Sequence, residues 1–279
     1  MKNAIKSKIV FMSTFPPTEC GIATFTIDLV EAITKGFNGS IESLFCDLTN
    51  SLKLDKGHYS LNPKEKDEYS KVALEINKNP SIKLVHIQHE FGLFGGEYGN
   101  YLLSFLEIIE KPVAITFHSV IPNPNLELKF IVQAIASYAN SVFVMTKKSE
   151  EILKDDYLIN ENKITYIPHG THIVNYLETK EIKKKFNLEH RTLLSTFGLL
   201  GPGKSIETAL KALPEIISHV PNVIYLIIGK THPNAIENNV DIYRDYLKDL
   251  VAFYKLNDYV FFIDHYLENN LSEKAQKAI

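Results

Sequence analysis

The chain of 279 residues contains no tryptophan and only two cysteines, Cys20 and Cys46. Neither cysteine belongs to a C-x-x-C pair, so disulfide scaffolds and cysteine zinc sites lack their ligands, and we expect a reducing, cytoplasmic setting. An excess of one charge is also missing, because 30 Lys and Arg stand against 33 Asp and Glu, for a formal net charge of -3. This near balance argues against a nucleic-acid partner.

Long hydrophobic runs are absent as well. The apolar run Ile9–Met12 behind the charged N-terminus is too short for a signal peptide. No stretch approaches the roughly 18 apolar residues that a membrane span needs. We therefore expect no transmembrane segment, whereas peripheral contact with a lipid surface stays open.

The composition that remains is that of a folded globular protein, with 45% hydrophobic and 23% charged residues. The length is close to twice a usual domain of roughly 150 residues, which predicts two domains. Short apolar runs alternate with longer amphipathic stretches, a pattern typical of α/β domains built on parallel sheets. We place the domains at 1–178 and 179–279, because the pattern lapses into a polar stretch after Gly170 and then restarts.

The first domain is predicted to hold one parallel sheet of six strands, each short and rich in β-branched or aromatic residues. The first connecting helix carries apolar residues at spacings of three and four and ends near Gly36. The predicted strands are Lys8–Ser13, Ile41–Cys46, Leu84–Gln88, Val113–Phe117, Val142–Met145 and Ile164–Ile167.

The second domain is predicted to contain three strands, Leu193–Phe197, Val223–Ile228 and Val260–Ile263, and all three have the composition of fully buried strands. Three strands are half of a doubly wound sheet, so we expect an incomplete domain whose open edge is covered by a partner or a second copy. A small complete domain is the alternative. The run Lys180–Lys185 is interpreted as a solvated helix or linker face.

Two loops of the first domain follow strands and carry candidate binding residues. The loop before Gly21 passes directly from strand to helix, where first-turn amides favour an anion such as phosphate. The next candidate loop holds His89, Glu90, Gly95 and Gly96 beyond the third strand, where doubly wound sheets read polar substrates. A metal shared by His86 and His89 is disfavoured, because residues three apart on a strand point to opposite faces.

Two further residues stand where chemistry is expected. His118 ends the strand that contains Thr116-Phe117 and is placed to face the same crevice, although a histidine satisfied by neighbouring backbone is an equally weighted interpretation. In the second domain, Gly198 to Ser205 matches the G-x-x-x-x-G-K-S pattern of a P-loop nucleotide hydrolase, with Asp264 as its magnesium-binding aspartate. Against that hydrolase, Pro202 lacks one of the amides that the loop needs. The weaker prediction is Lys204 at a helix N-terminus, aimed at a diphosphate.

With these loops in view, the sequence resembles the retaining nucleotide-sugar glycosyltransferases of family four, which have the GT-B fold of two Rossmann-like domains. The likeness runs almost end to end and rests on the order and spacing of short motifs. These are Pro-Pro-Thr-Glu-Cys-Gly21-Ile-Ala, Thr-Phe-His118-Ser, Ile-Pro-His-Gly170, Phe-Gly198-Leu-Leu-Gly-Pro-Gly-Lys204 and Val-Ile-Tyr-Leu-Ile-Ile-Gly229.

The resemblance implies transfer of a hexose from a UDP- or GDP-sugar to a carbohydrate or glycolipid acceptor with retention, and no metal or other cofactor. His118 would contact the transferred sugar, and Gly21 would lie against the donor phosphate and acceptor. Lys204 would neutralise the leaving diphosphate, with Gly198, Gly203 and Ser205 in the phosphate-binding turn.

Two departures from the family pattern limit what the resemblance implies. Leu199 stands where many members have an arginine of the diphosphate clamp. The family's glutamate pair would lie beyond Ile279, so we expect a C-terminally truncated transferase, and whether this chain is active stays open. The alternative is a non-catalytic sugar- or nucleotide-binding remnant.

Overall fold

The computed structural model describes residues 6–49, 57–171, 173, 177–231, 236 and 241–263. The chain divides into two compact units, Met1–Gly170 and Thr171–Ile279. Among the described residues, no helix combines the length and the apolar character needed to cross a bilayer. Both units are α/β, as the sequence predicts, and each is built on a parallel sheet.

Unit 1 contains one sheet of seven parallel strands in the order β3-β2-β1-β4-β5-β6-β7. All six predicted strands are present, with ends displaced by at most two residues. The seventh strand, β3, was missed because its two residues are too few to show a pattern. The strands are β1 Ser7–Ser13, β2 Ile41–Asp47, β3 Tyr59–Ser60, β4 Ile82–His89, β5 Val113–Phe117, β6 Ser141–Val144 and β7 Ile164–Tyr166.

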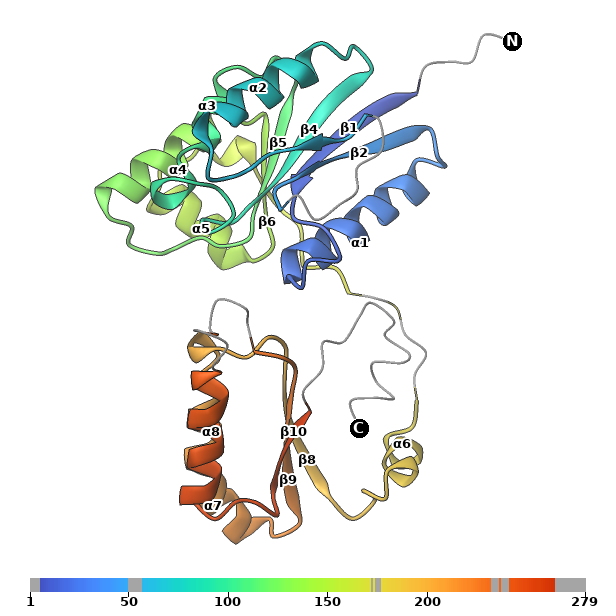
Figure 1. Ribbon diagram of the computed structural model, residues 1–279, viewed down its shortest axis with the longest axis vertical. Coiled ribbons are helices and arrows are strands. Elements are labelled where there is room, and N and C mark those ends of the chain that lie inside the picture. Colours follow the sequence, from blue (N-terminus) through green and yellow to red (C-terminus); the bar gives the residue numbers. More distant parts are fainter. Residues whose placement is uncertain are drawn as a thin grey trace. The chain divides into compact units, whose positions relative to one another are not determined.

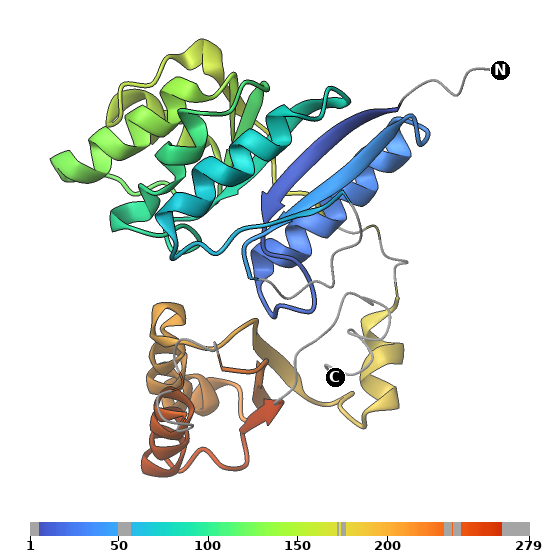
Figure 2. The same ribbon diagram turned by 45° about the horizontal axis from the view of Figure 1, so that its top comes forward.

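Helices cover both faces of this sheet (Figure 1). Alternate residues of β1 explain the layering: Val10 and Met12 join the core under α2 to α5, whereas Ile9 and Phe11 pack toward α1 on the opposite face. Figure 2 shows α1 running along β1 and β2. The helices are α1 Gly21–Gly36, α2 Lys66–Asn77, α3 Leu102–Leu106, α4 Leu126–Tyr138 and α5 Lys147–Asp155.

Unit 2 contains three parallel strands in the order β10-β9-β8, which are β8 Thr192–Phe197, β9 Val223–Ile228 and β10 Val260–Ile263. Helices α7 Ile206–His219 and α8 Ile242–Phe253 cover one face, and α6 Thr179–Lys185 lies on the other side of the sheet (Figure 1). The lysine-rich α6 has no buried residue, in keeping with a solvated face.

The prediction that all three strands of unit 2 are buried is wrong. Only the central strand β9 is buried at every position. In β8, Leu194 is 37% and Phe197 62% exposed. The physical reason is position: β8 has a neighbour on one side only within the described sheet, so part of its surface remains open.

The strand order of unit 1 identifies the edge where a ligand is expected. The order reverses between β1 and β4, and in doubly wound sheets ligands bind outside the carboxyl ends of the strands at this switch point. The loops after β1, β4 and β5 all leave from that edge of the parallel sheet. Gly21 at the start of α1, His89 at the end of β4 with Glu90 after it, and His118 after β5 stand at this edge.

Candidate functional site

Buried polar side chains gather at the carboxyl ends of the central strands of unit 1. They are Ser13 at the end of β1 and Thr14 just after it, His86, Gln88 and His89 on β4, and Thr116 on β5, all at most 8% exposed. Burying polar groups costs free energy unless they are paired, so sheet interiors rarely hold so many. This rim, which includes the neighbouring His118, is the candidate site of unit 1.

His118 is held between β4 and α1. Its backbone N–H donates to the carbonyl oxygen of His89 at 2.9 Å, and its ring Nε2 lies 2.9 Å from Oε1 of Gln88. The ring of Phe25 packs against it in a T-shaped arrangement, at a centroid distance of 5.0 Å and an interplanar angle of 89°. Burial, with a contribution from the charge of His169, lowers the pKa of His118 to about 4. The imidazole is therefore neutral at pH 7.

His86 and His89 have separate surroundings, as their spacing predicts. The ring of His86 lies 2.9 Å from the Oγ1 of Thr116, whereas His89 packs among the rings of Phe91, Phe94 and Phe117. Burial lowers the pKa of His86 to about 4 and that of His89 to about 3, with His118 adding to both shifts. Over the described residues, no three His, Cys, Asp or Glu side chains converge as a metal site would require.

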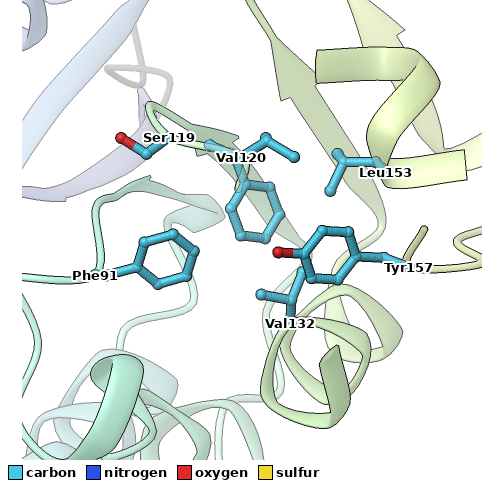
Figure 3. Close-up of a pocket in the computed structure, with 7 residues that line it drawn as sticks. Phe91, Ser119, Val120, Val132, Leu153 and Tyr157 are labelled. Atoms are coloured by element: carbon cyan, nitrogen blue, oxygen red, sulfur yellow. The ribbon is translucent and has the colours of Figure 1, made fainter. Parts of the chain in front are cut away.

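Glu90 and Ser119 form a second polar pair at this rim. The hydroxyl of Ser119 donates to Oε2 of Glu90, and the amide of Phe91 donates to Oε1 at 3.1 Å. Beside this pair, Phe91, Phe117 and Tyr157 help to line an apolar pocket, and the hydroxyl of Ser119 points away from it (Figure 3). The pocket has no room for a water molecule, so the polar pair is the more accessible feature.

Gly21 is exposed and is the first residue of α1. A Cβ at this position would meet no atom within 4 Å, so the space beside the backbone is open. The first turn contains no acidic residue, and within the described structure the side chain of Cys20 makes no capping hydrogen bond. The amides of this turn are therefore available to an anion.

Gly95 and Gly96 have a structural reason to be glycine. A Cβ on Gly95 would lie 2.0 Å from the carbonyl oxygen of Pro63, and one on Gly96 would lie 2.6 Å from the ring of Tyr101. Gly96 also has a φ of 79°, which favours glycine. The compactness of this loop explains both residues, and their predicted contact with substrate stays a prediction.

In unit 2 the loop after β8 is closed by contact between two backbones. Gly198 and Gly229 have φ angles of 129° and 134°, and a Cβ on Gly229 would stand 2.0 Å from the carbonyl oxygen of Gly198. Lys204 follows at the end of a 3₁₀ turn, Pro202–Lys204, with its side chain exposed. Gly203 has open space beside it, and Ser205 adopts a left-handed conformation before α7.

The first turn of α7 is engaged by protein groups that the sequence analysis did not identify. The amide of Ile206 donates to the hydroxyl of Tyr243 at 3.1 Å, and that hydroxyl donates to Oε2 of Glu207 at 2.6 Å. The bond from Tyr243 lowers the pKa of Glu207, so the first turn carries a carboxylate. Since the Ile206 amide is already bonded, the exposed side chain of Lys204 is the predicted anion-binding group that stays available at this turn.

Arg244 is a second residue that the sequence analysis missed. Its side chain is 5% exposed, donates from Nη2 to the carbonyl oxygen of Gly229 at 2.7 Å, and pairs through Nε with Asp241 at 3.2 Å. It thereby holds the loop after β9 against α8. The sequence did contain a signal for its burial. Arg244 stands next to Tyr243, which begins the apolar face that continues through Leu247 and Val251, and a charged residue on a buried helix face needs a partner.

The structure therefore brings some predicted residues together and leaves others apart. The ring of His118 contacts Phe25 of α1, and its backbone amide donates to the carbonyl oxygen of His89. Glu90, by contrast, accepts a hydrogen bond from Ser119. Asp264, proposed as a magnesium ligand, lies outside the described residues.

No protein-family model and no curated protein matches the sequence. Solved structures do match. HepE from Anabaena in complex with UDP and glucose is 14% identical over 92% of this chain and 69% of that chain, with a TM-score of 0.66. A glycosyltransferase from Rickettsia africae is 19% identical over 93% of this chain and 68% of that chain, with a TM-score of 0.65. A UDP-forming α,α-trehalose-phosphate synthase from Burkholderia xenovorans is 12% identical over 97% of this chain and 75% of that chain, with a TM-score of 0.63. The fold is therefore of the GT-B glycosyltransferase type.

Proposed function

We propose that the chain is a nucleotide-sugar-dependent glycosyltransferase that moves a hexose from a UDP- or GDP-sugar to a hydroxyl of a carbohydrate or glycolipid acceptor, with retention. The observation that carries the proposal is the shared fold, which spans 92% of the chain in the comparison with a protein holding UDP and glucose. The family-four resemblance of the loops at Gly21, His118 and Lys204 supports the retaining mechanism and the reaction class.

The proposed reaction breaks the bond between the anomeric carbon and the diphosphate oxygen and forms a bond from the same carbon to the acceptor oxygen. Negative charge grows on the departing diphosphate, and an oxygen of that diphosphate takes the proton that the acceptor hydroxyl loses. Stabilising that charge is the main electrostatic task of such a site. We assign it to the exposed ammonium of Lys204 in unit 2, assisted by the backbone amide of Gly203 in the turn that begins at Gly198, and we assign no metal or other cofactor.

In unit 1 we assign sugar recognition to His118 and contact with the donor phosphate or acceptor to the α1 amides at Gly21. A neutral imidazole can donate from one nitrogen and accept at the other, which suits a sugar hydroxyl. The low pKa of His118, about 4, supports this assignment. His89 and Glu90 complete the proposed substrate side, and a cytoplasmic location stays part of the same proposal.

The test is a transfer assay on the full chain with UDP- and GDP-hexoses and a panel of sugar and glycolipid acceptors. We expect one donor class to be turned over, with the anomeric configuration of the product kept, as read by NMR. The variant His118→Ala should lose transfer by more than tenfold while nucleotide affinity in calorimetry changes little, and His219→Ala, an exposed histidine on α7, serves as the control. Equal losses of transfer and binding would reduce His118 to a structural role.

Two other outcomes would replace the proposal. Binding of a nucleotide sugar with neither transfer nor donor hydrolysis would favour a non-catalytic binding protein. Magnesium-dependent ATP or GTP hydrolysis that disappears in Lys204→Ala would favour the P-loop hydrolase suggested by the G-x-x-x-x-G-K-S pattern.

A further inference from the structure

We propose that Gln88 is a positioning residue, whose amide oxygen holds His118 in the neutral tautomer protonated at Nε2 and leaves Nδ1 to accept a hydrogen bond from a sugar hydroxyl. The role of Nδ1 rests on the proposed function, whereas the choice of tautomer follows from contacts within unit 1. Gln88 lies near the carboxyl end of β4, beside the switch point of the sheet.

The geometry leaves the ring of His118 little freedom. Its Nε2 is 2.9 Å from Oε1 of Gln88, and its backbone amide is bonded to the next residue on the same strand, His89. The ring of Phe25 packs against the imidazole at close to a right angle. Gln88 itself is fully buried, so water does not compete for its amide oxygen.

The chemistry of the contact determines the tautomer. With the amide oxygen of Gln88 toward the ring, the oxygen can only accept, so Nε2 carries the proton of this bond. A neutral imidazole has a single ring N–H, so Nδ1 keeps its lone pair, and it has no hydrogen-bond partner among the described residues.

The amide nitrogen of Gln88 shows why this contact requires an explanation. It is buried without a hydrogen-bond partner in the described part of the chain. A buried unpaired donor is destabilising, and an apolar side chain of similar length, such as methionine, would avoid that cost. The contribution of glutamine at this position is therefore its oxygen.

The surroundings of His118 oppose its protonation. Burial of the ring disfavours its charged form, and a positive charge on His169, beyond β7, adds to this effect. The carboxylate of Glu90, in the neighbouring loop, already accepts from Ser119 and from the amide of Phe91. An amide partner adds no negative charge, whereas a glutamate in its place would stabilise the imidazolium.

The test is NMR of the full chain with ¹⁵N-labelled histidine and no substrate, in the wild type and in Gln88→Met and Gln88→Glu. The signals of His118 are assigned by their loss in His118→Gln. We expect the wild type to show only the Nε2–H tautomer from pH 7 to pH 5, and Gln88→Met to show a mixture of tautomers. Gln88→Glu should raise the pKa of His118 by on the order of 1 to 3 units.

The matched control is Gln133→Met, which makes the same substitution at a partly buried glutamine of α4 bonded to the carbonyl oxygen of Tyr157 and should leave the His118 signals unchanged. A wild type protonated at Nδ1, or an unaltered tautomer in Gln88→Met, would overturn the inference. If Gln88→Met does not fold, the tautomer of His118 in the wild type and the pKa of His118 in Gln88→Glu still test the inference.

The enzymatic readout separates the inference from the proposed function. In Gln88→Glu, the acid side of the transfer profile should move upward by the same interval as the pKa of His118, with nucleotide affinity unchanged. The expected tautomer in a chain that transfers no sugar would refute the proposed function alone. An active chain with the wrong tautomer would refute only the role of Gln88.

Discussion

The helices that follow the first strand of each unit, α1 after β1 and α7 after β8, begin in opposite electrostatic settings. Helix α1 begins at the exposed Gly21 without an acidic residue in its first turn, and no capping side chain is found in the described structure. Helix α7 begins with Glu207 in its first turn, and its Ile206 amide is bound by Tyr243. Backbone amides are thus available for an anion at α1, whereas at α7 the exposed cation is a side chain, Lys204.

This difference shows that a motif and a binding site are distinct things. The G-x-x-x-x-G-K-S pattern before α7 is the more specific of the two in sequence, yet its helix N-terminus is already engaged by protein groups. The single glycine before α1 is weak as a motif, but the space beside it is open. Availability depends on neighbours from distant parts of the chain.

The largest effect is expected at the backbone contact of unit 2. Gly229→Ala should destabilise this unit by about 3 kcal/mol or more, because its Cβ collides with Gly198 and its φ of 134° disfavours alanine. Hydrogen exchange of β9 peptides would measure the loss. Gly203→Ala, with open space around it, is the control and should change stability little. Equal stability of both variants would contradict the close contact.

The buried histidines should make unit 1 the acid-sensitive half. The pKa of His89 is about 3 in the folded chain, against 6.5 when exposed. Below pH 6.5 the unfolded chain therefore binds a proton that the folded chain excludes, and stability falls by about 1.4 kcal/mol per pH unit for each such group.

The variant His89→Phe should lower the slope of unfolding free energy against pH by the contribution of one proton, about 1.4 kcal/mol per pH unit below pH 6.5. The unfolding free energy above pH 6.5 should change far less. Hydrogen exchange of β4 peptides between pH 7 and pH 4.5 would measure it, with His219→Gln as the control. An unchanged slope in His89→Phe would mean that His89 is not the group that resists protonation.

A variant of Lys204 tests whether this side chain binds the diphosphate at α7, where the Ile206 amide is already bonded to Tyr243. Lys204→Ala should weaken binding of a nucleoside diphosphate by about 1.5 to 3 kcal/mol, the range for a charged hydrogen bond. Lys211→Ala removes the same charge from an exposed position on α7 and is the matched control. Calorimetry with UDP and GDP gives the answer, and similar affinities for both variants would remove Lys204 from the site.

The smallest effect concerns the hydroxyl that engages α7. Tyr243→Phe should cost unit 2 about 1 kcal/mol, because it removes the bonds to Ile206 and Glu207. It should also free the Ile206 amide and raise the affinity for a nucleoside diphosphate. Tyr246→Phe on the same helix is the control. A fall in affinity in Tyr243→Phe would show that the hydroxyl itself serves the ligand.

Much of the fold could be predicted from the sequence, because buried parallel strands have a composition that local segments reveal. The strand Val113–Phe117 was predicted to the residue, and among the strands described in unit 1 the two-residue β3 is the one that was missed. The burial of β8 was predicted wrongly, since the composition of a strand does not tell how many neighbours it has. The candidate loops were found by their position after strands, but the partners of their residues were not.

The sequence by itself determined that this is an α/β protein, where its strands lie, and that polar residues follow β4, β5 and β8, because these properties depend on residues close together along the chain. Only the tertiary structure decided that Gln88 meets His118, that Tyr243 engages the start of α7 and that Arg244 reaches Gly229. Each of these contacts joins different elements, and their geometry exists only after the strands have taken their places in a sheet.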